Sequence, residues 1–176
     1  MINDKEAGMQ FGSIKDVYTH ELQDLHSAET QLIEALPKMA QAASSDELRQ
    51  AFEQHLQETR DHVERLDQIL ALAGTSAGGE KCKGMAGLIA EGERVVEAQG
   101  DPVLKDAALI SAAQRVEHYE IAAYGTARTF ADELGMDDAK DLLDQTLDEE
   151  SQADKLLTKI ATGGMLKTGI NQAARN

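Results

Sequence analysis

Aromatic residues are scarce in this sequence, at 3% of 176 residues; tryptophan is absent and proline occurs twice. Aromatic side chains are among the usual strand formers, so their scarcity argues against a β-sandwich or a β-barrel. Ala, Leu, Glu, Gln, Lys and Arg, which favour helices, are plentiful. The length suits one domain with a sizeable core. The composition therefore predicts an all-α protein.

Membrane and export signals are also missing. No run of about 18 apolar residues is present, which excludes a transmembrane helix. The first residues contain no basic segment followed by an apolar one, so no secretory signal is visible. Cys82 has no second cysteine with which to form an intrachain disulfide, and this fits a reducing compartment. We therefore expect a cytoplasmic protein.

Basic residues are few relative to acidic ones. The sequence has 17 Lys and Arg against 32 Asp and Glu, a formal net charge of −15. A polyanion or an anionic membrane surface would be repelled by this charge. We therefore expect neither nucleic acid nor a membrane as a partner.

Capping and turn residues divide the sequence into four long helices and one short helix. The start signals are Ser13-x-x-Asp16, Ser44-Ser45-Asp46-Glu47, Asp101-Pro102 and Asp137-Asp138, and the stop signals are Gly135 and Gly163-Gly164. Pro37 is expected to kink or shorten the first helix. Residues 74–84 are too rich in Gly, Ser and Thr to be helical, and a short amphipathic helix is expected at about 85–98.

The spacing of the helices predicts two antiparallel hairpins joined by a long crossover. The links within each hairpin are short, whereas residues 73–101 can run the length of a bundle. A ferritin-like four-helix bundle has this layout, here with a short extra helix in the crossover. We expect one such domain over residues 1–162. The residues that follow, 163–176, have weak periodicity and are expected to form a loosely ordered tail.

Carboxylates interrupt the apolar stripes of the long helices. In the first helix, the stripe through Leu25 and Leu32 passes through Glu29. The stripes of the last two long helices pass through Glu120 and Glu150 in the same way. A single inward Glu is commonly a helix-end or hydrogen-bonded side chain. Several at one level are different, because ionised carboxylates cannot share a dry core without cations or protons.

Four of these carboxylates are expected to meet near the middle of the bundle. Glu29, Glu58, Glu120 and Glu150 each lie about 14–16 residues from the turn of their own hairpin. The two halves of the chain also repeat each other, since Glu29 precedes Glu58 by about as many residues as Glu120 precedes Glu150. This pseudo-twofold set is typical of a di-iron or di-manganese centre, in which bridging carboxylates hold two metals about 3.5–4 Å apart.

The outer ligands depart from the Glu-x-x-His spacing that is usual in such sites. The available pairs are Glu58 with His62 and Glu150 with Asp154, both at i, i+4, which still places two groups on one helix face. His62 fits equally well as a core histidine bonded to a neighbour. His55 and His26 are left out of the predicted set. The predicted metal ligands are Glu29, Glu58, His62, Glu117, Glu120, Glu150 and Asp154.

Several segments of the sequence resemble the YciE/YciF family of bacterial ferritin-like stress proteins. They are LHSAETQLIEALPKMA, FEQHLQET, KCKGMAGLIAEG, RVEHYEIAAYGT and LDEESQADKLLTKIA, and together they cover roughly residues 11–162. The resemblance implies a ferritin-like fold, a homodimer, a cytoplasmic location, induction under stress and a dinuclear metal site. Family members often carry Gln where this chain has His62. The C-terminal GMLKTGINQAARN lies outside the resemblance.

The leading functional hypothesis is a non-haem metal protein that handles iron, oxygen or peroxide during stress. It would bind two metal ions, iron foremost and manganese second, and the small oxidant would be O2 or peroxide; an oxidase- or peroxidase-like activity is left open. The alternative is a metal-free, dimeric helical interaction protein with a vestigial carboxylate cluster. Iron storage in a closed cage is a third hypothesis, disfavoured because no periodic fifth helix follows the fourth.

Overall fold

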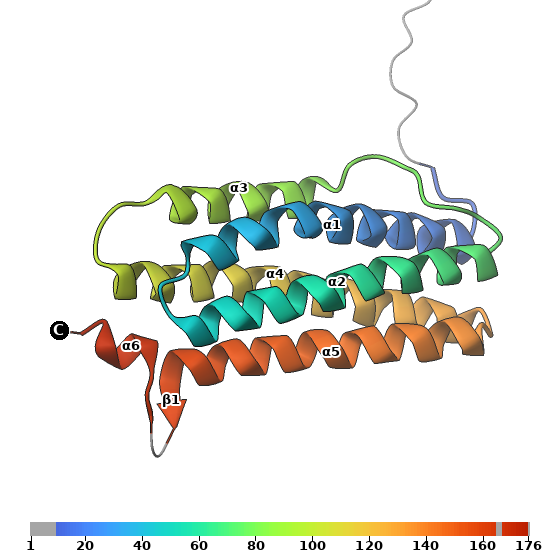
Figure 1. Cartoon of the computed structure of the whole chain (residues 1–176). Helices are drawn as coiled ribbons and strands as arrows, with labels where there is room; N and C mark the ends of the chain where they lie inside the picture. Colours follow the sequence, from blue (N-terminus) through green and yellow to red (C-terminus); the bar gives the residue numbers. More distant parts are fainter. Residues whose placement is uncertain (1–9, 165–166, 176) are drawn as a thin grey trace, which may run out of the picture.

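The chain forms six helices and one pair of very short strands in the computed structural model, which describes residues 10–164 and 167–175 (Figure 1). The helices are α1 (Ile14–Ala42), α2 (Asp46–Leu72), α3 (Lys83–Glu97), α4 (Pro102–Glu133), α5 (Asp137–Thr162) and α6 (Ile170–Ala173). The strands β1 (Gly163–Gly164) and β2 (Lys167–Thr168) pair antiparallel. The predicted all-α class is confirmed. No helix in the described ranges is long and apolar enough to cross a membrane.

Capping side chains begin three of the long helices. The side chain of Ser13 accepts a hydrogen bond from the backbone N–H of Asp16, and Asp101 caps α4 directly before Pro102. The second helix is capped by Ser45. Pro37 does not shorten α1, which continues for five residues beyond it.

Asp106 holds the link between α1 and α2 against α4. Its buried carboxylate accepts hydrogen bonds from the backbone N–H and the hydroxyl of Ser44 and from the backbone N–H of Ser45, at 2.7–2.8 Å. The hydroxyl of Ser44 is therefore engaged by α4, which leaves Ser45 to cap α2. This contact fixes how the two helix pairs are placed relative to each other.

Replacing Asp106 by Ala should therefore destabilise the protein strongly. The substitution leaves two backbone N–H groups of a tight link without their charged acceptor, at a cost of about 3 kcal/mol. For a chain of this length we expect the melting temperature to fall by about 6–12 °C. Thermal melts followed by circular dichroism measure this. Asp141→Ala, which removes an exposed carboxylate from α5, is the matched control. An equal loss in both variants would contradict the role given to Asp106.

The four long helices pack side by side, α1 against α2 and α4 against α5, with α2 also against α5 and α1 against α4 (Figure 1). The short helix α3 lies outside this group, along α1 and α4. Helix α4 thus packs against α1, α3, α5 and α6, which explains why its apolar residues are spread around its circumference.

The core consists of two apolar clusters with a polar layer between them. One cluster lies toward the link between α1 and α2 and includes Leu32, Leu36, Phe52, Ile110 and Leu157. The other lies toward the opposite end and includes Leu22, Leu25, Leu66, Ile69 and Leu143. Along each long helix, the residues between these clusters are the buried polar ones. The core is therefore interrupted at one level on all four helices.

The segment 163–176, expected to be a loosely ordered tail, carries β1, β2 and α6 in its described part. Helix α6 packs against α4 and α5, and Ile170 contacts the apolar cluster near the link between α1 and α2. The turn at Gly163 needs glycine, because its φ is +73° and a Cβ atom there would lie 2.4 Å from the carbonyl oxygen of Lys167. Residues 165, 166 and 176 lie outside the described residues.

Candidate metal centre

Six side chains of types that can bind a metal ion lie in the polar layer between the two apolar clusters. They come from all four long helices and are buried: Glu29 from α1, His55 and His62 from α2, Glu117 and Glu120 from α4, and Glu150 from α5. Each lies on the inward face of its helix because the apolar stripe on either side of it is packed in the core. The helices themselves therefore bring the six side chains together.

These side chains form two ligand groups that share one residue. We call one of them the outer group; it consists of His55, Glu117, Glu120 and Glu150. The other, the inner group, consists of Glu29, His62 and Glu150. Within each group the ligand atoms lie within 4.8 Å of one another. Glu150 belongs to both, so one carboxylate stands between two positions at which a cation would be surrounded by ligands.

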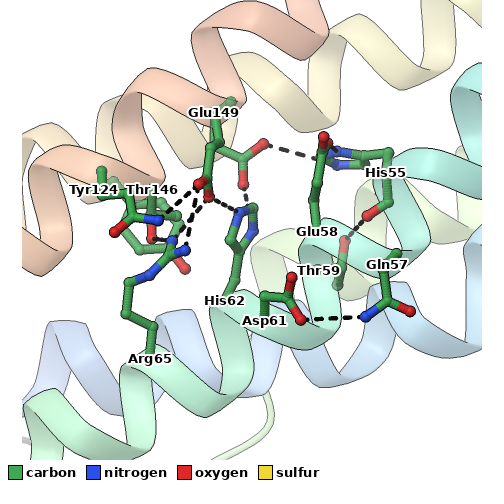
Figure 2. A network of polar contacts seen from close by, with 12 residues as sticks. His55, Gln57, Glu58, Thr59, Asp61, His62, Arg65, Tyr124, Thr146 and Glu149 are labelled. Carbon is green, nitrogen blue, oxygen red and sulfur yellow. Dashed lines mark hydrogen bonds and ion pairs between the residues drawn. The ribbon is translucent and has the colours of Figure 1, made fainter.

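Each histidine has one ring nitrogen in a ligand group and the other on an outside carboxylate. His62 Nδ1 lies 3.0 Å from Glu150 Oε1 and 3.3 Å from Glu29 Oε1, while its Nε2 lies 2.9 Å from Glu149 Oε2. Figure 2 shows the ring of His62 pointing from α2 toward Glu149. A carboxylate that accepts from one ring nitrogen fixes the tautomer and leaves the other nitrogen to bind a metal.

His55 repeats this arrangement about two turns earlier in α2. Its Nδ1 lies 3.4 Å from Glu58 Oε2, and its Nε2 lies 3.6 Å from Glu117 Oε1 and 3.7 Å from Glu150 Oε2. Glu58 and Glu149 are half-buried, so they lie between the centre and solvent. Glu58 thus orients a histidine in this geometry instead of joining a ligand group.

Further polar contacts hold the surrounding groups in place. Arg65 donates to both oxygens of Glu149, at 2.9 and 3.3 Å, and to the hydroxyl of Thr146 (Figure 2). The hydroxyl of Tyr124 donates to Glu29 Oε1. The ligand groups are therefore supported by a second layer of hydrogen bonds, which limits how far His62 and Glu29 can turn.

Burial and charge shift the pKa values of these groups in opposite directions. Burial raises the pKa of Glu29, and it raises those of Glu117 and Glu120 well above their usual value. At Glu150 burial acts in the same direction, but the imidazoles of His62, 3.0 Å away, and His55 hold its pKa below the usual value. The centre without metal is therefore expected to hold protons on several carboxyls, with Glu150 ionised.

The two histidines are expected to carry protons as well. Burial lowers the pKa of an imidazole, but at His55 the surrounding carboxylates, Glu117 first, outweigh burial and raise the pKa to about 10. At His62 burial is likewise outweighed, by the nearby carboxylates of Glu150 and Glu29, and the pKa is raised to about 11. Protons thus occupy the places in which cations would balance the carboxylates.

Many atoms of the centre have no hydrogen-bond partner among the described residues. Ten buried side-chain nitrogen and oxygen atoms are without one, and eight of these ten belong to the six ligand residues. Both oxygens of Glu120 and both of Glu150 are among the eight. Buried polar atoms are nearly always paired, so a concentration of unpaired ones marks a place that a bound group would fill.

Five of the seven predicted ligands lie in the two groups, and two do not. Glu58 contacts His55, as described above, and Asp154 accepts a hydrogen bond from the side chain of Gln114 at 3.0 Å and lies 3.4 Å from His118 Nε2. His55 was left out of the predicted set although it lies on the inward stripe of its helix. Glu149 was not singled out, and only its position beside Glu150 in the sequence could have indicated it.

Comparison with known proteins gives the chain a family. The DUF892 family, a domain of unknown function, matches residues 13–174. Protein YciF of Escherichia coli (strain K12) is 45% identical over 166 residues, which covers 94% of this chain and all of that protein. The chain belongs to the DUF892 family. The resemblance to the YciE/YciF family is thereby confirmed, and the family match extends past residue 162 into the segment with β2 and α6.

Solved structures support the same relationship for this DUF892 protein. The crystal structure of YciF, described as an E. coli stress protein, matches with a TM-score of 0.85 and 44% identity over 94% of this chain and all of that one. YcfI from Rhodopseudomonas palustris, described as a candidate structural protein, matches with a TM-score of 0.83 and 39% identity over 89% and 99% of the two chains. A protein from Xanthomonas campestris pv. campestris has the same fold, with a TM-score of 0.67, 20% identity, and coverage of 84% and 89%.

Proposed function

We propose that this DUF892 protein binds two metal ions in the polar layer, with iron as the preferred metal and manganese as the alternative. One observation carries the proposal: eight buried ligand atoms of six residues lie together without a hydrogen-bond partner among the described residues. Burying an unpaired polar atom lowers the free energy of unfolding by about 1–3 kcal/mol, so this arrangement destabilises the fold unless cations bind there.

The chemistry of the ligands fits this choice of metals. Four carboxylates and two imidazoles are available, listed above as the outer and inner groups. Carboxylate oxygens suit manganese and iron, and imidazole suits iron. Glu150 would bridge the two ions, and Glu58 and Glu149 would hold the histidines in the tautomer that binds metal.

The arrangement of the helices is proposed to be that of a ferritin-like bundle. Support comes from the two long helix pairs, the crossover through α3, and the contribution of at least one ligand residue from each long helix. The second helix differs from the usual pattern, because its pair reads His55-x-x-Glu58 where such sites carry Glu-x-x-His. In this chain the histidine of that pair faces the centre.

The proposed activity is the handling of iron together with a small oxidant, O2 or peroxide. Bound ferrous ions would supply the electrons for reducing such an oxidant, since this chemistry belongs to the metal. The residues of the chain would bind and orient the ions, and the two apolar clusters would keep bulk water away from them. Oxygen or peroxide consumption by the loaded protein distinguishes a catalyst from a passive metal binder.

The cellular setting is proposed from the relatives and from charge. YciF is described as a stress protein, and we extend a role in stress to this chain. We further propose that the protein is a cytoplasmic homodimer. Because its net charge is −15, we propose that it binds neither nucleic acid nor anionic membranes. Light scattering tests the assembly: a particle of dozens of chains would instead indicate iron storage.

A second function is favoured by the charges within the centre. The protonated histidines lie 3.0–3.7 Å from carboxylate oxygens of Glu29, Glu117 and Glu150, so positive and negative charges are partly balanced without metal. A metal-free, dimeric helical protein with a structural or interaction role is consistent with this, and YcfI is described as a candidate structural protein.

Metal loading separates the two functions. Protein stripped with a chelator, loaded anaerobically with Fe(II) and desalted should retain two iron atoms per chain by elemental analysis. The Asp154→Asn variant should also retain two, because Asp154 lies outside both ligand groups and contacts Gln114 and His118. Stoichiometry near zero for both Fe(II) and Mn(II) would exclude the metal centre and favour the structural role.

A further inference from the structure

A cavity of about 210 Å³ leads from the surface between α2 and α5 to the outer ligand group. Its inner wall includes His55 and Glu117, and its apolar wall includes Phe52 and Leu156. A water needs about 10–15 Å³ of such space, so the cavity has room for a cation with several waters. Figure 2 shows Glu58 beside His55 on α2 and Glu149 of α5 beside His62. Glu58, His55 and Glu149 all line the cavity.

The cavity reaches one ligand group but not the other. His55 and Glu117 line it, whereas Glu29, His62 and the shared Glu150 do not. These three side chains have no exposed surface. His55 Nε2 and Glu117 Oε2 are buried atoms without a hydrogen-bond partner among the described residues, and they belong to two residues that line the cavity. An entering ion would therefore meet the outer group first.

The charge of the cavity favours cations. The carboxylates of Glu58 and Glu149 line it, and both side chains are half-buried. Gln54 and Gln152 are exposed and lie at its rim, and none of its lining residues among those described is Lys or Arg. Glu58 and Glu149 together outnumber the protonated His55, so the lining keeps a net negative charge, which raises the local concentration of cations.

We propose that this cavity is the entry route for divalent cations, and that the inner position is filled only through the outer one. The inference rests on the proposed metal-binding function and adds a path and an order of loading to it. Gln152 is placed to control this path, because it is exposed at the rim and belongs to neither ligand group. A charge placed there would act on an ion before it is bound.

Stopped-flow measurement of Co(II) binding to stripped protein tests the route. Co(II) serves as the probe because nitrogen and oxygen sites bind it more tightly than Fe(II) or Mn(II) and it absorbs visible light when bound. We expect Gln152→Glu to speed loading and Gln152→Lys to slow it, each by about fivefold at low salt, with both effects shrinking at high salt. Gln68→Lys, the same change at an exposed site on α2 outside the cavity, should leave the rate unchanged.

If the inner position is filled through the outer one, a substitution at the rim should change the rate at which each of the two positions binds Co(II). Gln152→Lys should slow the filling of the first and of the second position, since both ions pass the same rim. A bulky plug, Ala153→Phe, should slow both by at least tenfold while two Co(II) per chain still bind at equilibrium. If only the first phase responds, the inner position has its own route and the order is wrong.

Failure of this inference can be distinguished from failure of the proposed function. Two Co(II) per chain at equilibrium, with rates that are the same in Gln152→Glu, Gln152→Lys and the unaltered protein, would overturn the entry route and leave the metal centre intact. No bound Co(II) at equilibrium in the unaltered protein would overturn the metal centre itself.

Discussion

Replacing Glu150 by Gln is expected to lower the metal content from two ions per chain to nearly none. Glu150 is the residue that belongs to both ligand groups, so its loss removes a ligand from each position at once. The amide of glutamine keeps the size of the side chain but removes the negative charge that a cation needs. Elemental analysis after anaerobic loading with Fe(II) and desalting measures the change.

Asp148→Asn is the matched control for this experiment. It removes the same charge from an exposed position of the same helix, two residues away, and should leave two ions per chain. A Glu150→Gln variant that still binds one ion tightly would show that the carboxylate is not shared.

Glu29→Gln is a second test of the two ligand groups, and it remains informative if Glu150→Gln does not fold. Glu29 belongs to the inner group alone, so its replacement should remove one ion and leave the other. Loss of both ions from a folded Glu29→Gln variant would contradict the division into an outer and an inner group. Circular dichroism of each variant before loading establishes that it is folded.

The stability of the metal-free protein should fall as the pH rises from 6 to 9. A group whose pKa is raised by folding stabilises the protein fully below its unfolded pKa and loses that contribution as the pH approaches its folded pKa. For the histidines the unfolded value is 6.5, and the folded values are about 10 at His55 and about 11 at His62. The raised pKa values of Glu117 and Glu120 act in the same direction above 4.5.

Glu150 does not oppose this trend in the same range. Its pKa is lowered by folding, so its contribution is present above its unfolded value of 4.5 and is lost only as the pH falls below that value. We expect the melting temperature of protein in excess EDTA to drop by about 5–10 °C between pH 6 and pH 9, or about 2–3 kcal/mol for a chain of this length.

Metal should reverse the trend. The ligands must lose their protons before they bind a cation, so affinity rises with pH, and a ligand that binds only the folded protein stabilises it more as its affinity rises. The gain in melting temperature on adding Mn(II) should therefore be small at pH 6 and largest at pH 9. Parallel melts with EDTA and with Mn(II) across this range measure both effects.

His62→Gln tests the origin of the pH dependence. It removes the histidine whose pKa is raised further, to about 11 against about 10 at His55, and should flatten the dependence of the melting temperature of the metal-free protein on pH. His118→Gln, at an exposed histidine of α4, should leave the curve unchanged. A metal-free protein whose melting temperature is constant or rises between pH 6 and pH 9 would contradict the protonated centre.

The amino-acid sequence by itself determined the helical class and much of the polar layer. Helical periodicity identified Glu29, Glu120 and Glu150 as inward residues, because each interrupts an apolar stripe that must face a core. The distance of each from its hairpin turn predicted that they would lie at one level, and the structure places their ligand atoms in two adjoining groups. These features depend only on the pitch of a helix and the shortness of the links.

Tertiary packing decided which residues of α2 and α5 face the centre. His55 and His62 are seven residues apart and so differ by about 20° around the helix axis, whereas Glu58 is turned by about 60° from His55. Periodicity alone allows either the face with His55 and His62 or the face with Glu58 to point inward, and the packing of α5 against α2 decides between them. Asp154 lies one turn beyond Glu150, about 6 Å along the axis, and reaches Gln114 instead of the polar layer.

Only the three-dimensional structure could reveal the charges of the centre and the way into it. The pKa values of Glu117 and His62 depend on burial and on neighbours from other helices, which no local sequence pattern records. The cavity is lined by side chains of α2, α4 and α5, so its existence depends on how three helices pack. Periodicity places a side chain on a face of its own helix, but contacts and access are properties of several helices together.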